Sequence, residues 1–473
     1  MSSSPDLQTP PGIVELREDV PLKPSGGSSE RLCAGGPRLI LAAFAVLTAA
    51  ITIALLTQIY YGDYEVVPHG SVSSSAAACS RAGTAALRGG GRALDAAAVT
   101  ALCLAVLAPH RTSLDASGSL VYWEYRSSRT QLPTVVEWGG VEGAAGAAGE
   151  AGEASARPPR LLVALAALHE KLGALPWSQV LQPAIDLAKG GFPVSETLAL
   201  EAESRGITGY TAAALRSEPA LADYLQSLQH NTTTELCAAW SCSSAVQWRA
   251  ASAARGAAAG GWRVWAGGAG GARAADALHN AFEADPSPVN TLKLVIDELQ
   301  AAWKAAGPSA PRGVASGLAV VDSQDTYAAL VTGLSVPFGS EAGALSSGNV
   351  WVRDMPTAPL DLAPAIITDQ NVCGTRYVMG AESGAALAEG ATNILLGGGA
   401  SAVDAVEIAR VVILPDGTLA LEPGHPLPAL PALPALPALN ASAPLAALNF
   451  VQQTGDALLS HADSRGGGLA SRF

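Results

Sequence analysis

Residues 312–321 read RGVASGLAVV and predict a turn that leads into a buried strand. A short apolar run that follows turn-forming residues is typical of such a strand. A second strand is predicted from Ala328 to Leu334, after a turn that contains Asp322 and Asp325. Ser316 lies at the predicted start of the first strand, where its hydroxyl is either a nucleophile or a group without a chemical role.

The chain on the amino-terminal side of this strand pair predicts a mixture of helices and strands. The expected helices run from Ala93 to Ala108, Leu161 to Leu172 and Trp177 to Lys189, and the expected strands from Leu120 to Tyr125 and Thr134 to Trp138. Residues 139–158, 250–275 and 426–439 are rich in alanine, glycine or repeated Pro-Ala-Leu. We expect a surface loop in the first, a loose insert in the second and an exposed extended loop in the third.

Composition narrows the possible classes of function. The 473 residues carry a net charge of −13 and show no basic stripe, which argues against nucleic acid as a partner. Apolar residues make up 49% of the chain and charged residues 15%, with 50 glycines and 31 prolines. These values indicate a globular body interrupted by inserts of small residues.

The segment from Leu39 to Gly62 contains no charged residue and is long enough to cross a bilayer. Arginines precede it and acidic residues follow it, namely Arg31, Arg38, Asp63 and Glu65. The positive-inside rule predicts a single-pass type II membrane protein with a cytoplasmic tail (1–37), an anchor (38–61) and an extracellular remainder. The alternative is a cleaved signal peptide, whose apolar region is normally shorter and nearer the amino terminus.

Cysteines and sequons agree with an oxidising exterior. Cys33 precedes the anchor, and five cysteines follow it: Cys79, Cys103, Cys237, Cys242 and Cys373. Two bridges and one free thiol are the simplest arrangement of those five. Asn231-Thr-Thr and Asn440-Ala-Ser are glycosylation sequons, which are used only outside the cytoplasm.

Motifs of established chemistry are missing from the sequence. No P-loop, HExxH, paired CxxC or GxSxG pattern occurs, and the seven histidines are scattered, so we expect neither a metal nor a cofactor. The glycines at 89–91 before Arg92 are compatible with an anion site at a helix amino terminus. A tight turn feeding a core helix is the preferred interpretation of those glycines.

Several stretches resemble, in order, the γ-glutamyltransferase (glutathione hydrolase) family. CSRAGTAALRGGGRALDAAAVTALCLAVLAPH at 79–110 is similar to a family helix bounded by two cysteines, and LPWSQVLQPAIDLAKGGFPV at 175–194 is similar to its LPW…PAI.LA..GFPV segment. Shorter similarities are LSVPFGS, VMGAESG, AVEIAR and ADSRGGG, at 334–340, 378–384, 405–410 and 462–468. The resemblance covers most of residues 62–473 and implies a disulfide between Cys79 and Cys103, with Cys237 and Cys242 as a second close pair.

The resemblance implies an α+β fold: the four-layer αββα sandwich of amino-terminal-nucleophile hydrolases, preceded here by one transmembrane helix. Such a precursor cuts itself before a threonine, which would give a large-subunit-like region (62–315) and a small-subunit-like region (316–473) that form a heterodimer. The freed α-amine activates the neighbouring hydroxyl, and backbone amides hold the oxyanion. The implied substrates are glutathione or other γ-glutamyl compounds, with water, amino acids or peptides as acceptors.

This sequence departs from the family pattern at the nucleophile. Matching GLAVV to the family strand places Ala315 where the threonine is expected, with Ser316 next to it. A shift of one residue moves a side chain to the opposite face of a strand, so Ser316 acts as the nucleophile only if a local turn re-registers it. The arginine expected to clamp the donor carboxylate is absent from 136–140, which leaves Arg126 or Arg129 as substitutes.

The other candidate residues follow from the same resemblance. Ser383 and Gly384 are the candidate oxyanion donors. The candidate substrate-binding residues are Thr332, Asp354, Gln370 and Asn371. Two functions remain open: a γ-glutamyl hydrolase and transferase that works through an acyl-enzyme, and a non-catalytic family member that keeps the fold for binding.

Overall fold

The computed structural model describes residues 36–61, 69–127, 131–139, 158–242, 246–250, 256–285, 287–340, 350–370, 374–397, 401–414, 416–426, 436–440 and 445–473. The chain divides into two compact units, Met1–Glu65 and Val66–Phe473. The predicted Cys33 and Cys373, the candidate Asn371 and most of the insert at 139–158 lie outside the described residues.

The first unit contains helix α1, Gly36–Tyr61. Within it, Arg38–Thr57 is long and apolar enough to cross a membrane, and none of that span is buried against protein. At 1.5 Å per residue, the 26 residues of α1 rise about 39 Å, which exceeds the roughly 30 Å hydrocarbon core of a bilayer. The predicted anchor therefore coincides with one continuous helix.

The second unit is built around two antiparallel sheets. The seven-stranded sheet has the order β17-β1-β9-β10-β2-β3-β6, and the six-stranded sheet has the order β16-β15-β12-β11-β8-β7. The strands of the first are β1 (Ser71–Ser74), β2 (Ser117–Glu124), β3 (Thr134–Trp138), β6 (Val246–Ala250), β9 (Val314–Val321), β10 (Thr326–Leu334) and β17 (Ser471–Arg472). Those of the second are β7 (Gly256–Ala259), β8 (Trp262–Ala266), β11 (Ala363–Asp369), β12 (Arg376–Ala381), β15 (Leu448–Thr454) and β16 (Ala457–His461).

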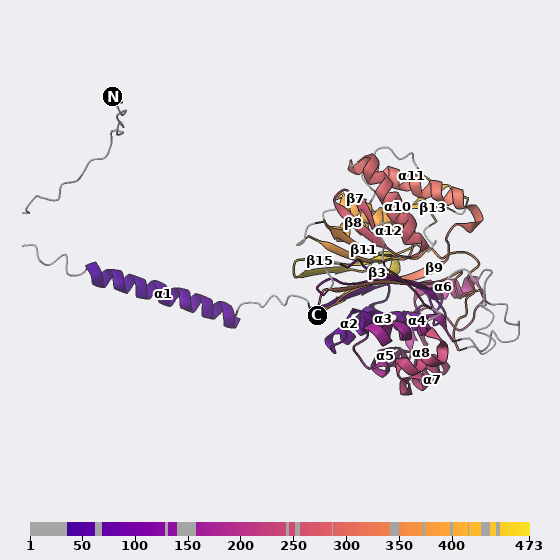
Figure 1. The fold of residues 1–473 in the computed structure, drawn as a ribbon, viewed down its shortest axis with the longest axis horizontal. Helices are drawn as coiled ribbons and strands as arrows, with labels where there is room; N and C mark the ends of the chain where they lie inside the picture. The colour runs from indigo at the N-terminus through magenta and orange to yellow at the C-terminus, as the bar shows by residue number, and fades with distance from the viewer. Residues whose placement is uncertain are drawn as a thin grey trace, which may run out of the picture. The chain divides into compact units, whose positions relative to one another are not determined.

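Helices cover the outer face of each sheet (Figure 1). The seven-stranded sheet packs against a group that includes α2 (Ala77–Arg88), α3 (Ala93–Leu107), α4 (Arg160–Leu172), α5 (Trp177–Gly190), α7 (Pro219–Ser227) and α8 (Thr233–Trp240), while α6 (Glu196–Ser204) lies beside this group. The six-stranded sheet packs against α10 (Gly268–Ala284), α11 (Pro288–Ala306) and α12 (Gly384–Leu395). Two further strand pairs form small two-stranded sheets: β4 (Phe192–Pro193) with β5 (Leu215–Arg216), and β13 (Val411–Ile413) with β14 (Leu419–Leu421). The remaining short elements are helix α13 (Ala402–Val406) and the single 3₁₀ turns η1 (Leu228–His230), η2 (Gly307–Ser309) and η4 (Ser464–Gly466).

The inner faces of the two sheets share one apolar core. Ala319 and Val321 of β9 pack there with Ile366 of β11 and Val378 of β12. A side-chain methyl at Gly317 would overlap the carbonyl oxygen of Gly380, so the backbones of the two sheets are in contact at two residues without side chains. The mixed α+β class expected from the sequence is confirmed.

The predicted elements correspond to observed ones with small shifts in their ends. The helices expected from Ala93, Leu161 and Trp177 are α3, α4 and α5, and the structure contains the predicted disulfides Cys79–Cys103 and Cys237–Cys242. β9 begins at Val314, so Ser316 is its third residue and not its first. The continuous pairing of β9 with β10, which includes Gly333 opposite Ala315, explains the earlier start.

The expectation of a loose insert at 250–275 is wrong for most of that segment. It contains β7, β8 and the first two turns of α10. The small residues have a packing role there: Gly270 and Gly271 are buried, and a methyl at Gly271 would stand 3.2 Å from the Cβ of Ala266. Alanine and glycine thus let α10 approach the sheet closely, a role that composition alone does not separate from that of a flexible linker.

Candidate functional site

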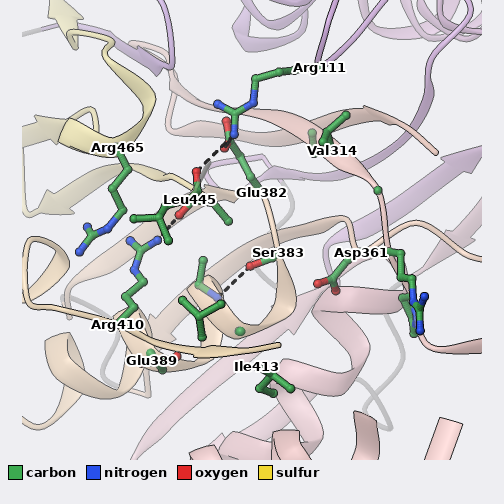
Figure 2. A pocket seen from close by; sticks show the side chains of 18 of the residues that line it. Arg111, Val314, Asp361, Glu382, Ser383, Glu389, Arg410, Ile413, Leu445 and Arg465 are labelled. Carbon is green, nitrogen blue, oxygen red and sulfur yellow. Dashed lines mark hydrogen bonds and ion pairs between the residues drawn. The ribbon is translucent and has the colours of Figure 1, made fainter. Parts of the chain in front are cut away.

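A cavity of about 470 Å³ lies beside the start of β9. Its wall combines residues of α6, α10, α11, α12 and β13 with the segment that leads into β9 (Figure 2). Charged side chains dominate its polar surface: Arg111, Glu201, Arg273, Arg312, Asp361, Glu382, Glu389, Arg410 and Arg465. Of the predicted site residues that the structure describes, Ser383 alone lines this cavity.

Ser316 is not part of the cavity wall. Leu318 and Val320 belong to the core beneath the helices, and side chains alternate along a strand, so Ser316 points to the same helix-covered side. Its side chain is 1% exposed, and its Oγ has no hydrogen-bond partner among the described residues. Val314 and Ala315 line the cavity instead, so the residue in the position of the family threonine contributes only a methyl group.

The candidate substrate-binding residues are bonded within the protein or lie at its surface. Thr332, opposite Ser316 on β10, shares a 2.7 Å hydrogen bond with the hydroxyl of Thr112. Asp354 is fully buried and accepts hydrogen bonds from the backbone N–H groups of Ser335 and Ser340, at 2.8 and 3.1 Å. These contacts hold the segment that follows β10.

The remaining predictions concern the surface. Gln370 is exposed at the end of β11, where its backbone N–H donates to the carbonyl of Gly261. Asn231 and Asn440 of the two sequons are both exposed. Arg126, a suggested substitute for the carboxylate clamp, pairs with Asp325 outside the cavity.

The candidate oxyanion donors lie at the amino terminus of α12. Ser383 caps this helix, and its Oγ accepts a hydrogen bond from the N–H of Ala386 at 3.1 Å. The N–H of Gly384 donates to Oδ1 of Asp361 at 3.1 Å, and Arg273 contacts the same oxygen at 2.7 Å. A carboxylate of the chain itself therefore uses the backbone donor that an oxyanion would need.

Sequence reasoning missed the arginine that enters the cavity next to this helix. Arg111 contacts Oε2 of Glu382 at 2.6 Å, and Glu382 also accepts hydrogen bonds from Ser75 Oγ and Ala447 N. Burial raises the pKa of Glu382, and the positive charge of Arg111 opposes that effect. The neighbouring His110 is kept neutral, because burial and Arg111 lower its pKa to about 3. The Pro-His that closes the first matched stretch marked this position, but its role depends on long-range contacts.

A second group of charges lies behind the opposite wall. Arg465, in the matched ADSRGGG stretch, contacts Glu422 at 2.6 Å and Asp463 at 3.0 Å. Arg410, in the matched AVEIAR stretch, pairs with the other oxygen of Asp463, and it lies beyond α13, which ends at Val406. All four side chains are at least nine-tenths buried, so these two short motifs meet in one ion-pair network.

The fold resembles that of a solved structure of low sequence identity. It matches the cephalosporin acylase from Bacillus halodurans with a TM-score of 0.60, over 86% of this chain and 96% of that one, at 16% sequence identity. Identity this low shows a shared fold and no more.

Part of the chain matches a known family in sequence. Residues 79–237 match the gamma-glutamyltranspeptidase family. Glutathione hydrolase 7 from Bos taurus is 34% identical over 207 residues, and glutathione hydrolase 6 from Bos taurus is 38% identical over 135 residues. These alignments cover 42% and 28% of this chain, and 30% and 25% of the two relatives. The matched part of the chain thus supports the γ-glutamyltransferase family that the motifs predicted.

Proposed function

We propose that this chain binds γ-glutamyl compounds such as glutathione in its cavity as an intact single chain, without forming an acyl-enzyme. The observation that carries the proposal is the position of Ala315, which lines the cavity where the family threonine is expected. A methyl group has no lone pair with which to attack an amide carbonyl. The cavity's volume and its mixture of cationic and anionic groups suit a small ligand that carries both charges.

Two further features support binding without turnover. A nucleophile must approach the reacting carbon to about 3–3.5 Å, whereas Ser316 points toward the helices. The backbone N–H of Gly384 donates to Asp361, so a developing oxyanion would have to displace a carboxylate already paired with Arg273. Both the attacking group and one of its stabilising donors are thus withheld from the cavity.

Hydrolysis or transfer through Ser316 is the second candidate function. The unpartnered, buried Oγ of Ser316 favours it, because an unsatisfied buried hydroxyl costs about 1–3 kcal/mol and is often retained for a chemical role. In this mechanism Ser316 Oγ attacks the Ala315 carbonyl, and water hydrolyses the resulting ester, which leaves a carboxylate on Ala315 and a free α-amine on Ser316. Ser316 Oγ then attacks the γ-amide carbonyl, the amine leaves, and water or an amino acid resolves the ester.

Intact mass and amino-terminal sequencing of the full-length protein, purified in mild detergent, separate these candidates. We expect one chain, and calorimetry should show glutathione bound without release of glutamate. A fragment beginning at Ser316, with cleavage abolished in Ser316→Ala, would establish the second candidate. A single chain that does not bind glutathione would contradict both.

We also propose the cellular arrangement that the sequence predicted. α1 would anchor the chain as a single-pass type II protein, with residues 62–473 folded outside as an amino-terminal-nucleophile hydrolase sandwich. The apolar length of α1, the exposed Asn231 and Asn440 and the two disulfides support this orientation. Removal of N-glycans from protein made in a secretory host should lower its mass, and Asn231→Gln should remove one glycan.

A further inference from the structure

A second pocket, of about 390 Å³, lies among the helices that cover the seven-stranded sheet (Figure 1). We call it the outer pocket. Its wall is formed by the end of α3, the segment between α6 and β5, the first turn of α7 and residues 350–352. Among the described residues it shares none with the cavity beside β9: His110 and Arg111 line that cavity, whereas Pro109 lines the outer pocket. Its volume is typical of small-molecule sites, which span roughly 300–1,000 Å³.

The floor of the outer pocket is apolar and already formed. Val106 and Leu114 line it and are at most 2% exposed. Ile207 and Trp351 are partly buried on the same wall, and the Trp351 ring packs 4.6 Å from that of Tyr224, measured between centroids. Side chains held in this way need no rearrangement to receive an apolar group, which removes part of the cost of binding.

One cation at the rim of this pocket is held in a fixed orientation. The Nε of Arg216 donates to Glu218 at 2.5 Å, and its Nη1 donates to the carbonyl of Gly209 at 2.8 Å. Its guanidinium carbon lies 3.9 Å from the centre of the Tyr210 ring. Burial raises the pKa of Tyr210 to about 12, although Arg216 acts to lower it, so the ring is neutral and does not cancel the arginine charge. The Arg216 side chain is 26% exposed, which leaves this fixed charge accessible to a ligand.

The charged groups that line the outer pocket carry an excess of positive charge. They are Arg205, Arg216 and Glu218. Arg205 pairs with Glu201 at 2.8 Å, but Glu201 lines the cavity beside β9 and not the outer pocket. The whole chain carries a net charge of −13, so the positive excess is a local property of this wall. It favours an anion there.

We propose that the outer pocket binds a small carboxylate with an aromatic or branched aliphatic body, its carboxylate at Arg216 and its body against Leu114 and Ile207. The inference goes beyond the proposed function and does not depend on it. A planar guanidinium matches the two oxygens of a carboxylate, and the body of the ligand covers apolar floor that water otherwise contacts. A small anion leaves the floor exposed, and a neutral apolar molecule leaves the arginine charge unused, so the site selects a ligand with both parts.

Calorimetry on the full-length protein in mild detergent tests the site, with indole-3-acetate as the probe. Indole-3-acetamide is the neutral comparison, because it has the same ring and nearly the same shape, and acetate is the comparison without a ring. We expect indole-3-acetate to bind about tenfold more tightly than the amide. Acetate at the same concentrations should give no measurable heat of binding, because it covers almost none of the floor.

Two substitutions at the rim assign the carboxylate to its partner. Arg216→Gln should weaken indole-3-acetate about tenfold and leave the amide unaffected. Arg205→Gln should weaken indole-3-acetate about threefold, because Arg205 is exposed and solvent screens its charge. This second variant keeps the test decisive if Arg216→Gln fails to fold, since Arg216 also supports Gly209 and Tyr210.

Two more variants make the test specific. Ile207→Ala removes part of the apolar floor and should weaken the acid and the amide alike, by about fivefold. Arg81→Gln is the matched control, because Arg81 is exposed on α2 and is not part of the wall of either site. It should bind like the wild type. Melting temperatures of all variants identify any that fail to fold.

The outcomes separate this site from the cavity beside β9. Tighter binding of the acid than of the amide, lost in Arg216→Gln or reduced in Arg205→Gln, would support the inference. Equal affinities for acid and amide, or no binding to the folded wild type, would overturn it. Loss of the probe in Arg312→Gln would also overturn it, because Arg312 lines the cavity and not the outer pocket. Glutathione enters none of these measurements, so the proposed function is tested independently.

Discussion

The two faces of β9 differ in the chemistry that surrounds them. On the helix side, Ser316 and its neighbour Thr332 lie in an apolar core beneath α3, where Thr332 bonds Thr112 and Ser316 has no partner among the described residues. On the other side, Ala315 faces a cavity whose wall is rich in charge. A single step along the strand thus separates a buried hydroxyl from a residue that lines a charged cavity. Whether a chain keeps the fold and whether it keeps the reaction are therefore two separate questions.

The largest effect on the cavity side should come from Arg465→Ala. The side chain is 1% exposed and holds Glu422 and Asp463, so its removal leaves buried carboxylates uncompensated. We expect a loss of about 3–5 kcal/mol in the free energy of unfolding, measured by urea denaturation. The exposed pair Arg126–Asp325 provides the control, since Arg126→Ala should cost less than about 1 kcal/mol. Equal effects would show that burial does not govern the strength of these pairs.

Glu389→Gln should change the dependence of stability on pH. The folded-state pKa of about 7 lies above the usual value for glutamate, so the wild type loses stability as the pH rises from about 4.3 to 7 and then levels off. The variant lacks this titration. Its stability relative to that of the wild type should therefore be roughly 3 kcal/mol higher at pH 8 than at pH 4. Urea denaturation across this range tests the prediction. Parallel curves for the two proteins would contradict it.

Gly317→Ala probes the backbone contact between the two sheets at Gly380. A methyl group there would overlap the backbone carbonyl of Gly380, which cannot move away as a flexible side chain can. We expect a destabilisation of about 1–3 kcal/mol in thermal or urea unfolding. Gly190→Ala is the comparison, because a methyl at Gly190 meets no atom within 4 Å. A Gly317→Ala protein as stable as the wild type would mean that the sheets separate more easily here than their packing indicates.

The smallest effects should distinguish the two hydroxyls on the helix side. Thr332→Val removes the hydrogen bond to Thr112 and should cost about 1 kcal/mol. Ser316→Ala removes a buried hydroxyl that has no partner among the described residues, so it should leave stability unchanged or increase it by up to about 1 kcal/mol. A marked loss of stability in Ser316→Ala would show that this hydroxyl forms an interaction in solution.

Helices and strands were predictable where the local pattern is strong. The apolar spacing and the glycine stop of Trp177–Gly190 define α5, and Thr134–Trp138 was predicted with its observed bounds. The segment at 250–275 was not, because alanine and glycine are equally common in linkers and at close helix–sheet contacts. Their role was decided by what packs against them, and α10 packs against Ala363 and its neighbours.

Sequence by itself determined the match of residues 79–237 to the γ-glutamyltransferase family, an apolar segment long enough to cross a membrane and, through the family resemblance, the pairing of four cysteines. These properties depend on residue identity at short range or on the order of motifs. Tertiary structure alone decided the direction in which Ser316 points, the contact of Asp361 with Gly384, and the ion pairs of Arg111 with Glu382 and of Arg410 with Asp463. The partners in these contacts are separated by tens of residues along the chain. A charge is neutralised by whatever lies within a few ångströms of it, and the fold determines which groups those are.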